Sequence, residues 1–147
     1  MLIHETPAQL TDKLWMLGTA PYPLYLFRGA GGGTIFEGGV GSMGPLLLEQ
    51  LDRLEIPRDF VKQVVVTHAH PDHVMAVPLF RQVFPGVTVL ASETAAKTLS
   101  AEKAISFFTK LDEALNNSLA AAGLITDQHR PAPLTEKPHP PSVLGPV

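Results

Sequence analysis

Metal-binding side chains are concentrated at one place in this chain, and their position limits the folds that the chain can adopt. Four of them lie between positions 68 and 73, in the run T-H-A-H-P-D-H: His68, His70, Asp72 and His73. They offer imidazole nitrogens and carboxylate oxygens, which suit zinc and similar divalent ions. Residues 64–66, shortly before them, are all valine and predict a buried strand. The cluster is therefore expected where a strand ends and a loop begins, a common place for functional residues in α/β proteins.

Thr67 is the first residue of this run. The spacing of the four side chains within the run suits two neighbouring metal ions. Alternate side chains of an extended segment point to the same side, so His68 and His70 can reach one ion. A proline after His70 favours an extended backbone there and helps to hold that arrangement. Asp72 and His73 are consecutive, point differently from the first pair and could serve a second ion. Two ions about 3.5–4 Å apart can bridge a hydroxide, polarise a carbonyl or phosphoryl oxygen and stabilise a leaving group.

The same run also has a purely structural interpretation, as a polar loop in which Asp72 caps the following helix. Three of the six histidines of the chain nevertheless fall between positions 68 and 73. This density is hard to explain as ordinary surface and favours a metal site. Capping by Asp72 and metal binding are compatible with each other.

The rest of the chain alternates strand and helix patterns. Short apolar runs predict strands at residues 13–17, 24–28, 34–37, 64–66 and 87–91. Apolar residues at helical spacing predict helices at 45–54, 73–83, 93–99 and 101–122. Ser92 and Ser100 are predicted to cap the last two helices, and Gly123 to end the long one. The apolar stripe of the long helix favours core packing over a lid or a dimer contact.

Proline dominates the end of the chain. Six prolines between residues 128 and 147 leave no room for a regular element. The predicted organisation is therefore one domain at residues 1–127, followed by a proline-rich tail or linker at residues 128–147.

Composition narrows the class of function. With 147 residues, of which 45% are hydrophobic and 17% charged, the chain fits one soluble globular domain. A formal net charge of -3 gives no case for nucleic-acid binding. The chain has no cysteine, which excludes disulfides and thiolate sites, and no run of about 20 apolar residues that could span a membrane. Residues 1–10 do not have the pattern of a secretory signal, so a cytoplasmic location is expected.

At the histidine cluster the chain resembles the metallo-β-lactamase superfamily, whose hallmark is H-x-H-x-D-H after a buried strand. The resemblance covers about residues 12–125 in arrangement, and residues 67–73 carry the specific motif. It implies an α/β (α+β) fold, an αββα sandwich of which this chain supplies the N-terminal half, with a mixed β-sheet and flanking helices. It also implies a hydrolase that directs a metal-activated hydroxide at an ester, lactone, thioester, amide or phosphodiester.

The resemblance assigns roles to the members of the cluster. His68 and His70 would bind a first metal, and Asp72 and His73 a second. The metals implied are two zinc ions, with iron or manganese as alternatives. Asp72 would also orient or deprotonate the attacking water, which makes it the candidate catalytic residue, and the substrate would be a small molecule.

Departures from the family pattern indicate an incomplete domain. His129 and His139 are the only histidines downstream, and neither lies in the P-G-H-like segment that supplies the family's third histidine. The later aspartate that bridges the metals has no visible counterpart either. Glu37 stands where the family often has an aspartate of structural role, and Val-Met-Ala at residues 74–76 replaces small residues. A lone half would expose one apolar sheet face, so the chain is expected to associate, either as a homo-oligomer or with a missing C-terminal half.

Two other functions stay open. Residues 39–44 read G-V-G-S-M-G, a G-x-G-x-x-G loop between a predicted strand and a predicted helix, as in dinucleotide-binding proteins. The next strand, however, ends in Thr67 and His68 and not in an acidic residue that would hold a ribose. The other alternative is a non-catalytic metal-binding or interaction half-domain, because two imidazoles hold an ion less firmly than the usual four ligands.

Overall fold

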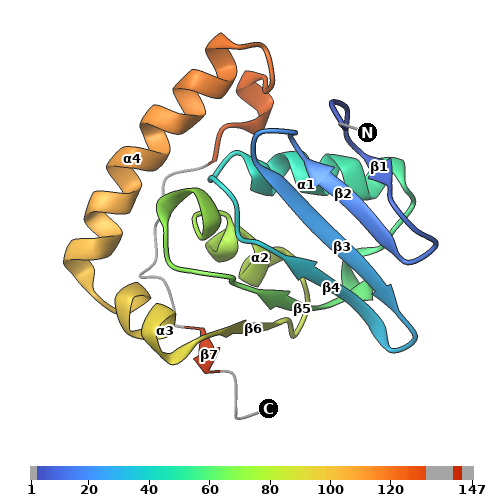
Figure 1. Cartoon of the computed structure of the whole chain (residues 1–147), viewed down its shortest axis with the longest axis horizontal. Helices are drawn as coiled ribbons and strands as arrows, with labels where there is room; N and C mark the ends of the chain where they lie inside the picture. The colour runs from blue at the N-terminus through green and yellow to red at the C-terminus, as the bar shows by residue number, and fades with distance from the viewer. Residues whose placement is uncertain (1–2, 132–140, 144–147) are drawn as a thin grey trace.

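One seven-stranded sheet forms the frame of the molecule, and its strands follow one another in chain order (Figure 1). The computed structural model describes residues 3–131 and 141–143. The strands are β1 (Ala8–Gln9), β2 (Leu14–Gly18), β3 (Pro23–Gly29), β4 (Gly32–Phe36), β5 (Val61–Val65), β6 (Thr88–Ala91) and β7 (Ser142–Val143). Strands β1 to β4 pair antiparallel, whereas β4 to β7 pair parallel. The sheet is therefore mixed, as predicted.

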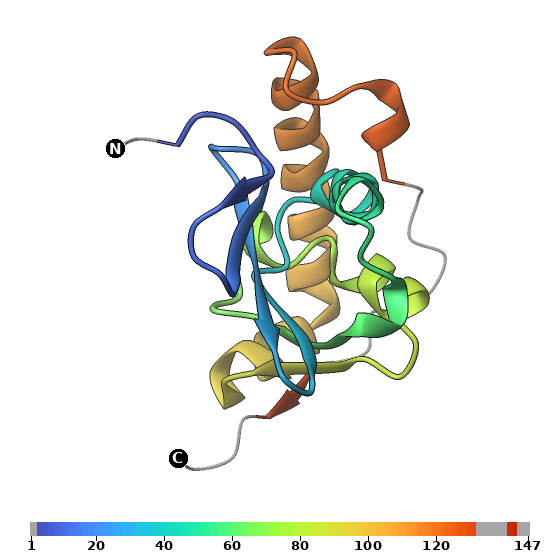
Figure 2. The ribbon, with the colours of Figure 1, turned by 90° about the vertical axis from the view of Figure 1, so that its right-hand side faces the viewer.

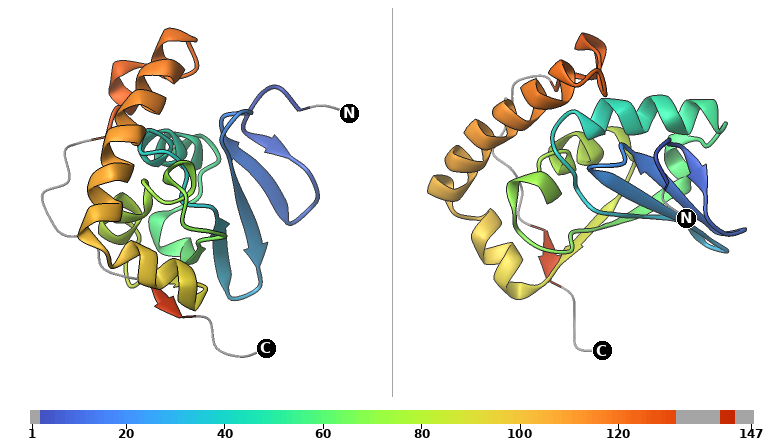
Figure 3. Two further views of the ribbon diagram at one scale, coloured as in Figure 1. Left: turned by 60° about the vertical axis from the view of Figure 1, so that its left-hand side comes forward. Right: turned by 45° about the horizontal axis from the view of Figure 1, so that its top comes forward.

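Helices flank this sheet. They are α1 (Met43–Arg53), α2 (Val77–Val83), α3 (Glu93–Leu99) and α4 (Glu102–Ala121), with short 3-10 turns η1 (Arg58–Phe60), η2 (Pro71–His73) and η3 (Asp127–His129). Figure 2 shows α1 and α2 on the same side of the sheet. Helix α4 is the longest, and Figures 1 and 3 show it beside the end of the sheet at which β4 and β5 finish. Within the described residues, no helix has the length and apolar character needed to cross a membrane.

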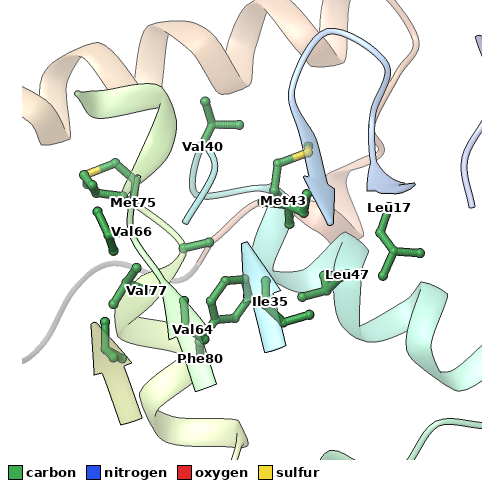
Figure 4. Close-up of a cluster of buried hydrophobic side chains, with 14 of the residues drawn as sticks. Leu17, Ile35, Val40, Met43, Leu47, Val64, Val66, Met75, Val77 and Phe80 are labelled. Atoms are coloured by element: carbon green, nitrogen blue, oxygen red, sulfur yellow. The ribbon is translucent and has the colours of Figure 1, made fainter. Parts of the chain in front are cut away.

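The core lies between the sheet and the helices α1 and α2, because side chains alternate between the two faces of each strand. On β3, Leu24 and Leu26 are fully buried, whereas Phe27 on the opposite face is 41% exposed. Register places Leu26 beside Ile35, and Ile35 beside Val64, in neighbouring strands. Figure 4 shows Ile35 and Val64 of this layer beside Leu47 of α1 and Phe80 of α2. The packing holds β4 and β5 side by side, so the segments that follow them leave the sheet at the same edge.

The helix predicted at residues 73–83 begins later than expected. Residues 71–73 form the 3-10 turn η2, and α2 starts only at Val77. Between them, the N–H groups of Met75 and Ala76 donate to the carbonyls of Gly39 and Gly38, at 2.9 and 2.8 Å. This tertiary pairing with a distant loop replaces the first predicted helical turn.

The predicted helix ends are partly correct. Ser92 caps α3 as predicted, because its hydroxyl accepts the N–H of Ala95 at 3.2 Å. Gly123 follows α4 with a φ of +74°, as expected for a glycine after a helix end. Ser100 does not cap α4, because its hydroxyl donates to the Ala96 carbonyl at the end of α3, at 2.8 Å.

The end of the chain carries more regular structure than predicted. Ser142–Val143 forms β7, which pairs parallel with β6. A sheet edge tolerates such a short strand between prolines, because only one side of it has to be hydrogen-bonded. Residues 132–140 and 144–147, which hold most of the proline-rich stretch, lie outside the described residues. The boundary between residues 127 and 128 therefore stays a prediction.

Candidate metal centre

The histidine cluster lies just beyond the end of β5. The strand finishes at Val65, and the chain then leaves the sheet and turns into η2. His68 and His70 are exposed, whereas Asp72 and His73 are half-buried. The ring centroids of His68 and His70 are 4.8 Å apart, and those of His68 and His73 are 4.0 Å apart. The structure thus brings the three imidazoles of the motif together at one edge of the sheet.

Asp72 and His73 present two donor atoms at the spacing of ligands that share an ion. The Oδ2 atom of Asp72 lies 3.4 Å from the Nε2 atom of His73. Two ligands that bind one zinc ion tetrahedrally, each at about 2.0–2.1 Å, lie about 3.3–3.4 Å apart. The spacing therefore fits a single ion held by both side chains. Neither η2 nor α2 has a side-chain cap, so the alternative role of Asp72 as a helix cap finds no support.

Glu37 belongs to the same cluster, although the sequence interpretation gave it only a structural role. It follows β4, and its N–H donates to the Val65 carbonyl at 3.0 Å. One carboxylate oxygen accepts the hydroxyl of Thr67, and the other contacts Nδ1 of His73. Potential ligand atoms of Glu37, His68 and His73 all lie within 4.8 Å of one another. These three residues form the candidate metal cluster that the geometry itself picks out.

Gly38 allows the loop after Glu37 to approach the motif closely. Its N–H donates to the His73 carbonyl at 2.8 Å. A Cβ atom at position 38 would lie 2.6 Å from that carbonyl oxygen and 2.9 Å from the Cα of Val74, which is closer than atoms pack. The residue is therefore glycine because of this close approach. The contact sets the position of His73 relative to Glu37.

Helix α4 fastens the next part of the glycine loop. The carboxylate of Asp112 accepts the N–H of Gly41 at 2.7 Å. The side-chain oxygen of Asn116 accepts the N–H of Ser42 at 3.1 Å, and its Nδ2 donates to Asp112 at 3.0 Å. We call these four residues the α4 clasp. Burial raises the pKa of Asp112, and the hydrogen bonds from Gly41 and Asn116 oppose that rise.

The sequence interpretation missed the α4 clasp. A signal was present, because residues 112 and 116 lie one and two turns after Phe108, on the buried side of the helix that also carries Leu119. Polar residues at such inward positions need hydrogen-bond partners. The pattern alone gives no indication of what those partners are.

The α4 clasp uses backbone donors that a dinucleotide-binding loop would offer to phosphates. The N–H groups of Gly41 and Ser42 are bonded to α4. Those of Met43 and Gly44 donate to the carbonyls of Val40 and Gly41. All residues from 38 to 44 are buried. These contacts favour a structural role for the G-x-G-x-x-G sequence.

His129, a candidate for the third metal-binding histidine, is engaged elsewhere. Its Nε2 contacts the carboxylate of Glu49 on α1, and its Nδ1 accepts the N–H of Thr126 at 3.0 Å. Hydrogen bonds from Arg53 and, second, from His129 lower the pKa of Glu49. The two ring nitrogens of His129 thus have partners in Thr126, which caps η3, and in Glu49 on α1. The other candidate, His139, lies outside the described residues.

The donor set fits a divalent metal. It consists of imidazole nitrogens and carboxylate oxygens, which suit zinc, iron and manganese. Nδ1 of His73 contacts the Glu37 carboxylate, and its Nε2 lies 3.4 Å from Oδ2 of Asp72. The His73 ring therefore lies between two carboxylates, an arrangement in which a cation is stabilised.

Comparison with known proteins identifies relatives of this arrangement. The family model described as the metallo-beta-lactamase superfamily matches residues 19–145. A metallo-beta-lactamase of Cronobacter sakazakii superposes with a TM-score of 0.61 and 18% identity, over 67% of this chain and 38% of that chain. MEM-A1, a subclass B3 metallo-beta-lactamase from a soil metagenome library, gives a TM-score of 0.60 and 23% identity, over 65% and 36%.

A third similar structure is the class B3 di-zinc metallo-beta-lactamase LRA-12 from an Alaskan soil metagenome. It gives a TM-score of 0.58 and 22% identity, over 62% of this chain and 34% of that chain. The chain therefore spans little more than a third of the length of these structures. The likeness shows the fold, over part of its length.

Proposed function

Because the chain belongs to the metallo-beta-lactamase superfamily, we propose that it carries the metal-binding part of a metal-dependent hydrolase. The observation that carries the proposal is the 3.4 Å spacing between Oδ2 of Asp72 and Nε2 of His73, with the His68 ring beside them. Donor atoms so spaced on consecutive residues fit an ion better than they fit an ordinary surface loop.

The proposed ligands divide into two pairs. His68 and His70 hold a first ion, and Asp72 and His73 hold a second. Zinc is the proposed metal, with iron or manganese as alternatives for the same donors. The di-zinc centre named for LRA-12 supports two zinc ions.

The proposed chemistry is hydrolysis of an ester, lactone, thioester, amide or phosphodiester in a small molecule. When bound, the metals would lower the pKa of a coordinated water to about 7 and polarise the substrate oxygen. Asp72 orients the attacking water and accepts its proton. The exposure of His68 and His70 leaves this side of the centre open to a substrate.

We also propose that a second copy of the chain covers the free face of the sheet. Register lines up one row of side chains on this face across five strands: Met16, Tyr25, Phe36, Val65 and Leu90. None of them is charged, so two copies of the row can face each other without burying an unpaired charge. Phe36 in this row and Phe27 beside it are 37% and 41% exposed.

The metal-site proposal is tested by elemental analysis of the purified chain. We expect bound zinc, iron or manganese, and loss of at least the first ion in the double variant His68→Ala/His70→Ala. The exposed His4, which lies outside the cluster, provides the matched control, because His4→Ala should keep the metal. A parent chain without any of these metals would overturn the two-metal site. Hydrolysis of a chromogenic member of each substrate class, with and without chelator, then tests the reaction.

A further inference from the structure

The glycine loop between β4 and α1 is bonded to the histidine motif through its first two residues. The N–H of Gly38 donates to the His73 carbonyl, and the Gly38 carbonyl accepts the N–H of Ala76, both at 2.8 Å. The Gly39 carbonyl accepts the N–H of Met75 at 2.9 Å. These three bonds lie at the end of the motif that carries the second pair of proposed ligands. Among the described residues, no backbone bond joins the loop to the first pair.

The α4 clasp holds the following residues of the same loop. The N–H of Gly41 donates to one Asp112 oxygen at 2.7 Å, and the N–H of Ser42 donates to the side-chain oxygen of Asn116 at 3.1 Å. The NH₂ group of Asn116 therefore faces Asp112, and its Nδ2 donates to the second Asp112 oxygen at 3.0 Å. Because backbone N–H groups can only donate, the direction of every bond in the clasp is fixed, and Asp112 accepts at both of its oxygens.

Both side chains of the clasp are buried, so water does not replace a bond that is lost. Asp112 is 6% exposed and Asn116 is 4% exposed. A Cβ atom at position 41 would lie 2.5 Å from the second Asp112 oxygen, so the contact requires glycine there. Helix α4 also packs beside η2 (Figures 1 and 3). The helix and the loop, fastened to each other by the clasp, thus both contact the part of the motif that carries the second pair.

The second pair has to keep its spacing to bind an ion. Oδ2 of Asp72 and Nε2 of His73 lie 3.4 Å apart, as two ligands of one ion would. Ligands must be held within about 0.5 Å of the binding geometry. The glycine loop fixes the backbone of this pair, whereas the first pair follows β5 directly. There the sheet gives the support, because the N–H of Val66 donates to the Leu90 carbonyl at 2.8 Å.

We propose that Asp112 and Asn116 are positioning residues for the second ion, because they hold, through the glycine loop, the segment that carries Asp72 and His73. The inference rests on the proposed metal-binding function. Loss of a residue that supports metal ligands typically lowers metal affinity by about 10–100-fold. Since the clasp acts through the loop, we expect the lower end of this range for the second ion. The first ion, whose ligands the sheet supports, should keep its affinity.

Exchanging the two side chains tests the clasp without changing composition or charge. Asp112→Asn alone turns an NH₂ group toward either the Gly41 N–H or the Asn116 NH₂, so one bond of the clasp is lost in any orientation. In the double variant Asp112→Asn/Asn116→Asp, the carboxylate at position 116 accepts the Ser42 N–H. The carboxamide at position 112 accepts the Gly41 N–H and donates to that carboxylate, so every bond is restored. Asn116→Ala keeps the Gly41 bond and provides a milder loss if Asp112→Asn does not fold.

The measurement is a zinc titration of the full chain at neutral pH that resolves two binding steps. In Asp112→Asn the second step should weaken by about 10-fold, while the first stays as in the parent. The exchanged double variant should bind both ions as the parent does. Glu113→Gln alters an exposed carboxylate on the same helix and is the matched control, which should change neither step. Equal weakening of both steps in Asp112→Asn, or an exchanged variant that binds no more tightly, would overturn the positioning role.

Amide hydrogen exchange of the metal-free chain separates this inference from the proposed function. The N–H groups of Met75 and Ala76 should exchange faster in Asp112→Asn and regain the protection of the parent in the exchanged variant. The N–H of Val66, which the sheet holds, is the internal reference. Unchanged exchange at Met75 and Ala76 would overturn the coupling even in a chain that binds two zinc ions. The expected exchange in a chain that binds no zinc would instead overturn the proposed function and leave the coupling intact.

Discussion

At position 38 the absence of a side chain lets two parts of the candidate metal centre approach each other closely. The loop after β4 and the motif after β5 meet where the N–H of Gly38 reaches the His73 carbonyl. No other residue type leaves room there, because any Cβ would overlap that carbonyl. The position of His73, a proposed ligand, thus depends on a residue that has no side chain.

Gly38→Ala should displace the motif from Glu37. We expect a loss of about 1–3 kcal/mol in the free energy of unfolding, because the added methyl group overpacks a buried contact. Zinc affinity should fall as well, since His73 moves with its carbonyl. Urea denaturation and zinc titration measure the two effects. Gly31→Ala is the matched control, because a Cβ there meets no atom within 4 Å; equal effects of both variants would contradict the steric argument.

The proposed ligands of the motif are visible in the sequence, whereas the residues that contact them are not. His68, His70, Asp72 and His73 can be found because they are close in sequence and follow an apolar strand. Glu37 bonds to Thr67 across 30 positions, and Asp112 bonds to Gly41 across 71. A local pattern contains no information about such distant partners, so their roles become visible only once the chain is folded.

Among the elements, helix α4 contacts both the histidine motif and the glycine loop. It packs beside η2, which carries Asp72 and His73, and it holds the glycine loop through the α4 clasp. Its length and its end at Gly123 were predictable from periodicity and from the glycine. The late start of α2 was not, because the segment before it bonds to the glycine loop and not to its own preceding turn.

The buried carboxylate of the α4 clasp predicts a pH dependence of stability. The pKa of Asp112 is raised in the folded chain, mainly by burial. The folded state therefore holds this proton more tightly than the unfolded state does. The contribution of Asp112 to the free energy of unfolding is fully present below the unfolded aspartate pKa of about 3.9 and is lost as the pH rises through the folded pKa.

Asp112→Asn has no such titration, so the stability of the parent relative to this variant should decrease as the pH rises through that window. Urea denaturation of both proteins at a series of pH values gives the difference. The exposed Asp59 provides a control, because Asp59→Asn removes a charge of the same kind outside the clasp. A difference between parent and Asp112→Asn that stays constant or grows with pH would contradict the linkage.

For the whole molecule, the two faces of the sheet have different roles. One face packs against α1 and α2, while the other carries an uncharged row with Phe36, beside the exposed Phe27. The core side chains and the uncharged row lie on opposite faces because side chains alternate along each strand. The proposed contact between two copies would cover this second face.

Phe27→Lys should therefore weaken self-association, because two introduced charges would face each other across the proposed contact. Gel filtration of parent and variant over a range of concentrations measures the effect. Phe107→Lys on α4 is the control, since this phenylalanine is 59% exposed and lies outside the sheet. A parent that elutes as a monomer at every concentration would contradict the proposed association.

The outermost strands of the described sheet, β1 and β7, consist of two residues each. Short edge strands give a neighbouring chain few backbone groups to pair with, so growth of the sheet from copy to copy is disfavoured. A face-to-face contact about a two-fold axis, in contrast, is complete once two copies have met. The short edge strands thus favour a closed pair of copies over fibres, which determines how the chain behaves at high concentration.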